Sequence, residues 1–460
     1  MGALDALKDL LGRTADYAAQ FHGTLADRPV RGRATFDELV DALGGPLADE
    51  GAEDADVLAE LVAAAEPGVV GTQTGRYFGF VIGSALPSSV AADWLATAWD
   101  QNAFSVTTSP AAAAVEDVAA GWLADLLGLP PGVASGFVTG AQGANTTALA
   151  AARHHVLAAA GWDVARDGLH GAPRIRVLAG EERHVTVDRA LRLLGLGTAA
   201  LEPVPADGQG RMRADVLRER LGSGAGPTIV CAQAGNVNTG AFDPIDELAG
   251  ACAEAGAWLH VDGAFGLWAA ASPRFRHLTA GCERADSWAT DAHKWLNVPY
   301  DCGVVFCRHP ASHGQAMAVA ASYLQRAEGR SPSDWVPESS RRARGFAVWA
   351  ALRALGRSGV ADLVDRCCDH ARTFADRLGA EPGVEILNDV VLNQVLVRFG
   401  DDETTREVVR RVQEGGVCWL GATDWQGRAA MRISVSSFRT TSEDVELSAA
   451  AILEAAGAGR

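Results

Sequence analysis

Cysteine is sparse in this sequence of 460 residues and forms no recognisable binding pattern. There is no CxxC pair, and no spacing of cysteine and histidine resembles that of a zinc site. We therefore expect no metal, and we interpret the eight cysteines as reduced residues of the core or surface. They are Cys231, Cys252, Cys282, Cys302, Cys307, Cys367, Cys368 and Cys418.

Long apolar runs and excess positive charge are also missing. No stretch reaches the roughly 18 uninterrupted apolar residues that a membrane span requires. The segment Met1–Ala6 places an acid early and lacks the basic region and apolar run of an export signal. Basic residues number 40 against 57 acidic ones, so the net charge is −17 and the pI is near 5.1. Because nucleic acid or an anionic membrane would require a basic face, we expect a cytoplasmic protein that binds neither.

Length and apolar periodicity divide the chain into several units. A chain of 460 residues exceeds what a single hydrophobic core usually supports. Residues 1–70 carry apolar positions at helical spacing and predict an N-terminal helical arm. Residues 71–310 contain a series of short apolar runs and predict a large ligand-binding domain. Residues 311–344 lack periodicity and predict a mobile loop and linker, whereas 345–460 predict a smaller C-terminal α+β domain.

The apolar runs of the large domain alternate with helical segments. This alternation predicts an α/β fold with a mostly parallel sheet covered on both faces. In such folds ligands bind at the carboxyl ends of the strands, where the candidate chemical residues of this chain lie. The expected strands are 136–139, 175–179, 228–232, 258–261, 286–290 and 303–306.

A lysine and an aspartate follow two of these runs. Lys294 lies between Trp288 and Trp295, and a partly desolvated amine can form a Schiff base with an aldehyde. Asp262 ends the run before Gly263 and Ala264, whose small side chains leave room for a flat ring. There a carboxylate can hold a heteroaromatic nitrogen protonated. A solvated lysine and a helix-capping aspartate are the alternatives, but the pair together predicts a pyridoxal-phosphate site.

Two further segments suit the same cofactor. The turn 138–146 follows a strand and opens an alanine-rich helix, so its backbone N–H groups can hold a phosphate. It is neither a P-loop nor a GxGxxG motif, and an ordinary tight turn is the alternative. His184 follows another strand and can stack on a ring, although a structural histidine is the more common case. His293, beside the lysine, can donate to phosphate.

In this order, the segments resemble the group II pyridoxal-phosphate-dependent amino-acid decarboxylases, the family of the aromatic-L-amino-acid and glutamate decarboxylases. The resemblance runs from about Tyr77 to the C-terminus and is most specific at His293-Lys294-Trp295. It implies fold type I, the aspartate aminotransferase-like fold, with a mostly parallel seven-stranded sheet. It also implies decarboxylation of an L-amino acid by a homodimer with active sites at the subunit interface.

The resemblance further implies roles for single residues at the cofactor. Lys294 would bind the aldehyde, Asp262 would pair with the ring nitrogen, and Ala264 and His184 would lie against opposite ring faces. The phosphate turn here reads Gly-Ala-Gln-Gly-Ala-Asn where many members carry serine and threonine, so its contacts would rely on the backbone. Asn236 stands where threonine is common. The residues assigned to phosphate are Ala141, Gln142, Gly143, Asn236 and His293.

On the substrate side, the resemblance identifies Tyr323 as the tyrosine of a catalytic loop that closes and donates a proton. Phe104 would line the pocket, across the dimer. Tyr77 and Phe78 suggest an aromatic or apolar pocket, although aromatic residues are as readily core. Arg432 is a candidate for binding a carboxylate, with an ion pair elsewhere as the alternative.

Other reactions remain open on the same cofactor residues. A pyridoxal-phosphate aldehyde synthase, an aminotransferase and a carbon–carbon lyase all share this fold. A catalytically silent cofactor-binding protein is a further alternative, which the presence of both Lys294 and Asp262 disfavours.

Overall fold

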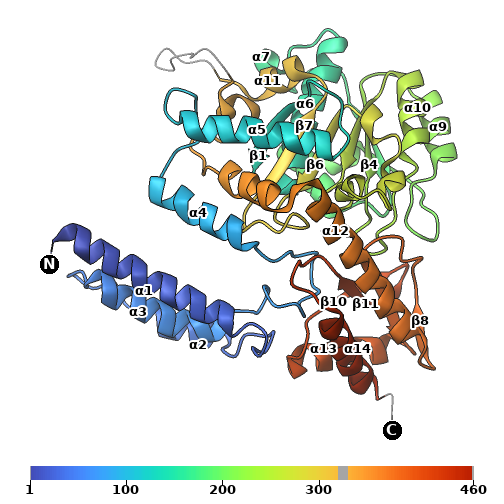
Figure 1. Cartoon of the computed structure of the whole chain (residues 1–460). Helices are drawn as coiled ribbons and strands as arrows, with labels where there is room; N and C mark the ends of the chain where they lie inside the picture. The colour runs from blue at the N-terminus through green and yellow to red at the C-terminus, as the bar shows by residue number, and fades with distance from the viewer. Residues whose placement is uncertain (1, 320–329, 458–460) are drawn as a thin grey trace.

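The structure is a computed structural model that describes residues 2–319 and 330–457. Its largest feature is a seven-stranded sheet in the order β1-β7-β6-β5-β4-β2-β3 (Figure 1). Within this sheet β7 alone runs antiparallel to its neighbours, β1 and β6. The strands are β1 (Ala134–Val138), β2 (Arg176–Gly180), β3 (Leu201–Val204), β4 (Thr228–Gln233), β5 (Trp258–Asp262), β6 (Ser287–Asp291) and β7 (Gly303–Cys307).

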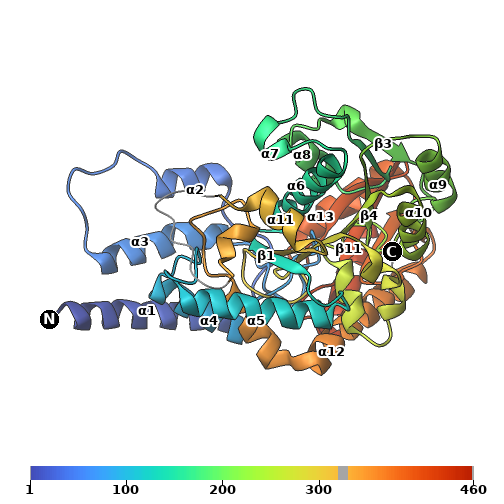
Figure 2. The ribbon, with the colours of Figure 1, turned by 90° about the horizontal axis from the view of Figure 1, so that it is seen from above.

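Helices cover both faces of this sheet (Figures 1 and 2). Five of the strands, β1, β4, β5, β6 and β7, are buried along their whole length, as expected for strands covered by helices on both faces. The helices of this unit are α4 (Pro87–Trp99), α5 (Pro110–Leu126), α6 (Ala141–Ala159), α7 (Val164–Asp167), α8 (Val185–Leu193), α9 (Ala214–Gly222), α10 (Ile245–Ala255) and α11 (Pro310–Met317).

Alternation along the strands divides the core into two layers. On β2, Val177 and Ala179 pack with apolar side chains of α6 and α8. Leu178, between them, points to the other face and joins the cluster that includes α9 and α10. This period of two places α6 over β5, β6 and β7, where its first turn can reach the strand ends.

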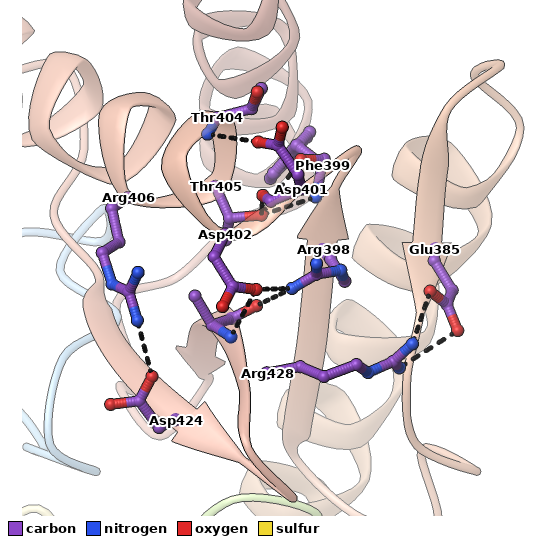
Figure 3. Close-up of polar contacts among 11 residues, drawn as sticks. Glu385, Arg398, Phe399, Asp401, Asp402, Thr404, Thr405, Arg406, Asp424 and Arg428 are labelled. Carbon is purple, nitrogen blue, oxygen red and sulfur yellow. Dashed lines mark hydrogen bonds and ion pairs between the residues drawn. The ribbon is translucent and has the colours of Figure 1, made fainter.

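A second, four-stranded antiparallel sheet has the order β10-β11-β9-β8. Ion pairs join its parts (Figure 3): Arg428 of β11 pairs with Glu385 of β8, and Arg398 of β9 pairs with Asp402 at the start of α13. Helix α12, which is interrupted at Gly356, contacts both units. The elements are α12 (Gly345–Gly379), β8 (Val384–Ile386), β9 (Gln394–Phe399), α13 (Asp402–Gly415), β10 (Gly421–Trp425), β11 (Arg428–Ser434) and α14 (Ser442–Ala456).

The N-terminal helices extend to one side of the rest of the chain (Figures 1 and 2). They are α1 (Ala3–Gly23), α2 (Phe36–Leu43) and α3 (Asp54–Ala65), and none of the three contains a buried residue. Leu4, Leu7 and Leu11 of α1 are 78%, 50% and 55% exposed. The arm therefore presents apolar side chains that its own chain does not cover. None of the helices in the described residues is long and apolar enough to cross a membrane.

The structure differs from the sequence-based expectation after β7. We expected 311–344 to be an irregular loop and linker, but α11 extends to Met317 and Pro332–Trp335 forms a 3-10 turn. Proline at the first position of α11 is compatible with a helix, because that residue has no intrahelical N–H partner to lose. The short or half-exposed strands β3, β8 and β10 were also not expected.

Candidate active site

Two charged side chains lie at the carboxyl edge of the large sheet. Asp262 is the last residue of β5, and Lys294 follows the end of β6 by three residues. Because β5 and β6 are adjacent and parallel, their carboxyl ends lie at the same edge. Helix α6 begins at Ala141, just after β1 ends at Val138, so its N-terminus reaches this edge too.

The backbone around Lys294 is held by close contacts. Asn297 adopts a left-handed conformation with φ 56°, and its side chain donates to the carbonyl of Ser436, 2.9 Å away. A Cβ at Gly83 would lie 1.9 Å from the carbonyl oxygen of Lys294, so only glycine fits there. The Lys294 side chain is 19% exposed, and its Nζ lies 3.2 Å from Oδ2 of Asp291. The amine is thus partly shielded from water and oriented toward the end of β6.

Three donors surround the carboxylate of Asp262, which is 5% exposed. Its Oδ2 accepts from Nδ2 of Asn145 at 2.9 Å and from the hydroxyl of Thr186 at 3.4 Å. Its Oδ1 accepts from the backbone N–H of Ala264 at 3.2 Å. An ionised carboxylate can only accept, so this environment suits that form.

His184 caps helix α8 and lies within the same group of charges. Its Nδ1 is 2.9 Å from the hydroxyl of Thr186. Burial lowers the pKa of His184, Asp262 opposes that effect, and Lys294 and Arg432 add to it. The imidazole is therefore neutral near pH 7. The hydroxyl of Thr186 also donates to Asp262, so Thr186 links His184 to that carboxylate.

The first turn of α6 provides the proposed phosphate contacts. The N–H of Ala141 donates to Oδ1 of Asp291 at 2.6 Å. The N–H groups of Gln142 and Gly143 belong to the first turn, where helix geometry provides no intrahelical acceptor. They remain suited to an anion, and the positive end of the helix dipole adds to this.

Close packing shapes the turn before that helix. A Cβ at Gly303 would lie 2.4 Å from the carbonyl carbon of Gly140, so β7 and the turn approach each other as only glycine permits. Nδ1 of His293 accepts from the N–H of Cys302 at 3.1 Å, which leaves the hydrogen on Nε2. That Nε2 lies 3.6 Å from Oδ1 of Asp291. It is therefore a further N–H donor near the first turn of α6. Burial lowers the pKa of His293.

Asn236 and Ala264 differ in whether their side chains are available to contact a cofactor. The amide of Asn236 donates to the carbonyl of Glu182 and accepts from the N–H groups of Asn238 and Thr239, so it serves its own turn. Its contact with phosphate stays a prediction that these bonds do not favour. Ala264 is partly exposed beside Asp262, as a residue against a ring face should be.

The aromatic residues predicted for the pocket are mostly packed inside the chain. Phe78 is 1% exposed and meets Phe374 edge to face, with ring centroids 5.0 Å apart. Tyr77 stacks on Trp419 at 5.0 Å, and burial raises its pKa to about 12. The backbone carbonyl of Phe104 accepts from the Ser333 N–H on the segment that precedes α12. Among the described residues, no hydrogen bond, ion pair or ring contact joins these three side chains to Lys294, and their pocket role stays a prediction.

Two remaining candidates are Arg432 and Tyr323. Arg432 lies on β11, and its buried Nε has no hydrogen-bond partner among the described residues. Burial lowers its pKa. A buried guanidinium nitrogen without an acceptor suits a carboxylate ligand. Tyr323 lies outside the described residues.

These groups fit pyridoxal phosphate. An acceptor for a ring N–H, an amine for an aldehyde, a small residue beside the ring and amide donors for a phosphate all lie at one edge of the sheet. Residues 46–399 match the family model described as the pyridoxal-dependent decarboxylase conserved domain. This match spans more than half of the chain.

The chain belongs to the pyridoxal-dependent decarboxylase family. It is a lyase, an amino-acid decarboxylase whose cofactor is pyridoxal phosphate. The resemblance seen in the sequence and the fold type I architecture are both confirmed.

Similarity to individual decarboxylases and related enzymes extends along nearly the whole chain. Tryptophan decarboxylase 1 of Oryza sativa subsp. japonica is 26% identical over 94% of this chain and 90% of its own length. The 4-hydroxyphenylacetaldehyde synthase of Rhodiola rosea is 26% identical over 94% of this chain and 91% of its own. The crystal structure of Oryza sativa TDC with PLP and tryptamine matches with a TM-score of 0.92 at 25% identity, covering 99% of this chain and 98% of that one.

Several residues of this decarboxylase's site were not singled out from the sequence. Asn145 and Thr186 bind Asp262, and Asp291 contacts both Ala141 and Lys294. Asn145 lies four residues into α6, and only the tertiary fold brings it to β5. One signal was available for the lysine: the sequence contains just two, Lys8 and Lys294.

Proposed function

We propose that this decarboxylase converts an L-amino acid to its amine with the cofactor attached at Lys294 Nζ. The observation that supports the proposal is the geometry of the carboxyl edge of the sheet. There Asp262 ends β5, and Lys294 Nζ lies 3.2 Å from Oδ2 of Asp291 at the end of the adjacent parallel strand β6. When bound, pyridoxal phosphate supplies a ring that accepts the electron pair left at Cα after CO2 departs.

Asp262 then acts as the residue that holds a proton on the ring nitrogen. A cationic ring accepts electrons better than a neutral one, and each 1.36 kcal/mol of transition-state stabilisation corresponds to a tenfold rate. His184, neutral and partly buried, would lie against the cofactor ring and orient the substrate carboxylate. Arg432 binds that carboxylate through the guanidinium edge that has no other acceptor among the described residues.

Tyr323 is the proposed proton donor to Cα. This role rests on the family resemblance, since segment 320–329 lies outside the described residues. When its loop closes, the Tyr323 phenol would give its proton to Cα of the substrate after CO2 leaves. Without that proton, dioxygen would accept two electrons from the substrate and water would release the product, giving an aldehyde, ammonia and peroxide.

We further propose an aromatic side chain on the substrate. Phe80, two residues after the buried Phe78, is 57% exposed and lies 5.3 Å from Trp419. Its backbone has φ 53°, a conformation that non-glycine residues rarely adopt and that is often found at binding sites. Gly83, three residues later, packs against the Lys294 backbone, so the segment that carries Phe80 leads to the lysine. Tryptophan decarboxylase 1 is named for such a substrate.

A product assay tests the reaction. Purified holoenzyme is incubated with each of the twenty amino acids, and CO2, amine, aldehyde, peroxide and keto acid are measured. We expect CO2 and amine in equal amounts, with aromatic substrates fastest, and a shift toward aldehyde and peroxide for Tyr323→Phe. Stoichiometric peroxide from the wild type would instead favour an aldehyde synthase, and keto acid an aminotransferase.

The enzyme is also proposed to be a homodimer. The exposed leucines of α1 form an apolar surface that the described part of the chain does not bury. In the proposed dimer, the arm of a second copy packs against this surface. Sedimentation should give twice 47.9 kDa for the wild type. Leu7→Glu combined with Leu11→Glu should shift the mass toward the monomer, whereas Leu447→Glu, at a leucine 48% exposed on α14, should not. A monomeric wild type would contradict the proposal.

A further inference from the structure

A line of hydrogen bonds runs from the amino end of β5 to Asp262 at its carboxyl end. The indole Nε1 of Trp258 lies 3.0 Å from Oγ of Ser287, which lies 2.9 Å from Nδ1 of His260. Nε2 of His260 lies 2.9 Å from Oδ1 of Asn145, and Nδ2 of Asn145 lies 2.9 Å from Oδ2 of Asp262. His260, Ser287 and Asn145 are completely buried.

The carboxylate end and a neutral His260 together fix the direction of this line. An ionised carboxylate can accept but never donate, so Asn145 turns its NH2 group toward Asp262 and its Oδ1 toward His260. His260 then carries its hydrogen on Nε2 and donates to Asn145 Oδ1. The other ring nitrogen, Nδ1, accepts from the Ser287 hydroxyl, which itself accepts from the indole N–H of Trp258.

A neutral His260 is required for this arrangement, and its environment provides one. Burial lowers the pKa of His260 to about 4, with Asp262 opposing the shift. At neutral pH one ring nitrogen thus accepts and the other donates. The far end of the line is also fixed, because the Trp258 ring packs against His155 at 5.1 Å and His309 at 5.0 Å between centroids.

The hydrogen-bond line determines the orientation of the Asn145 side-chain amide. The shape of an amide side chain does not distinguish its oxygen from its nitrogen, so hydrogen bonding decides which atom faces Asp262. The Asp262 carboxylate accepts on one side of the amide and His260 Nε2 donates on the other, so both neighbours select the orientation with the NH2 group toward the carboxylate. A flipped amide would oppose two acceptors in a buried site where neither could find water.

We propose that this one-way hydrogen-bond line makes His260 and Asn145 positioning residues, which hold the Asp262 carboxylate in the orientation that meets the cofactor ring. The proposal rests on the proposed pairing of Asp262 with the ring nitrogen. Neither His260 nor Asn145 needs to touch the cofactor for this role. The line consists only of side chains of this chain, so it is testable in protein freed of cofactor.

Two variants at one position separate orientation from packing. His260→Phe keeps the ring shape and removes the donor, whereas His260→Gln keeps an N–H near the position of Nε2. We expect His260→Phe to lower kcat at least tenfold with little change in KM for the amino acid, and to change the absorption and circular dichroism bands of the bound cofactor. His260→Gln should recover most of both losses. His154→Phe, which removes another buried histidine from α6, should leave the cofactor bands unchanged.

The direct test uses the protein without cofactor. Imidazole nitrogen NMR, with His260 assigned from the signal lost in His260→Gln, should show the hydrogen on Nε2 at pH 7. A hydrogen on Nδ1, or a charged ring, would overturn the one-way line. Equal cofactor bands and kcat in His260→Phe and wild type would overturn the positioning role while leaving the proposed decarboxylation intact. Failure of the decarboxylation itself would leave the NMR result unchanged.

Discussion

The two ends of the candidate active site differ in the groups that would contact the cofactor. At the carboxylate end, side chains from α6, α8 and β5 surround Asp262, and each has a specific partner. At the phosphate end, the contacts come from backbone N–H groups of α6 and from glycines that let β7 approach. Cofactor binding at the carboxylate end therefore depends on the identity of particular side chains. Binding at the proposed phosphate end depends mainly on backbone groups and on residues that have little or no side chain.

This contrast predicts the largest loss from a change at the carboxylate end. Asp262→Asn is nearly isosteric, but a neutral amide no longer holds the ring nitrogen protonated. We expect turnover to fall by about a thousandfold or more, equivalent to ~4 kcal/mol of transition-state stabilisation. The measurement is kcat with the best substrate, with circular dichroism as the control for folding. A loss below about tenfold, ~1.4 kcal/mol, would mean that another group maintains the electron sink.

At the proposed phosphate end, we expect adding one carbon atom to change cofactor affinity more than changing a functional group does. In Gly303→Ala the new Cβ would lie 2.4 Å from the carbonyl carbon of Gly140 and would push the turn away from its position. We expect cofactor affinity to fall roughly 10- to 100-fold, as measured by titration of the protein freed of cofactor. Gly415→Ala, where no atom lies within 4 Å of the new carbon, serves as the control. Unchanged affinity in Gly303→Ala would place the phosphate elsewhere.

Asp291 is an acidic side chain at the proposed phosphate end, and we expect the smallest effect from changing it. Its Oδ1 accepts from the same helix N-terminus that would hold the phosphate, and like charges at one site repel. Asp291→Asn keeps an acceptor for Ala141 and removes the charge, so cofactor affinity should rise by about tenfold, ~1.4 kcal/mol. Weaker binding in this variant would show that the contact between Asp291 and Lys294 matters more than the repulsion.

Much of the sheet was predictable from the sequence because most of its strands are buried along their whole length. The strands β1, β4, β5, β6 and β7 carry short buried runs between helical segments. Strand β3 was not predicted, because it has four residues, contains Pro203 and is buried only at Val204. Local pattern therefore identified the fully buried strands, including β1 at one edge of the sheet, and missed short or half-exposed ones.

The site divides in a similar way. Lys294, Asp262 and His184 follow strands, so their place at the carboxyl edge could be predicted from topology alone. Asn145 could not be predicted, because its partners on β5 are more than a hundred residues away in sequence. Phe78 was predicted for the pocket from its residue type, but it packs in the core, and its neighbour Phe80 is the exposed ring.

The central claim is that Lys294 carries the cofactor, and the sequence makes its test unusually clean. The chain has only two lysines, and the other, Lys8, lies in the N-terminal arm. Borohydride reduction of the holoenzyme, followed by peptide mass mapping, should place the cofactor mass on the Lys294 peptide. Lys294→Ala should lose both this label and essentially all turnover. Label on Lys8 or on the N-terminal amine, or full labelling in Lys294→Ala, would contradict the account.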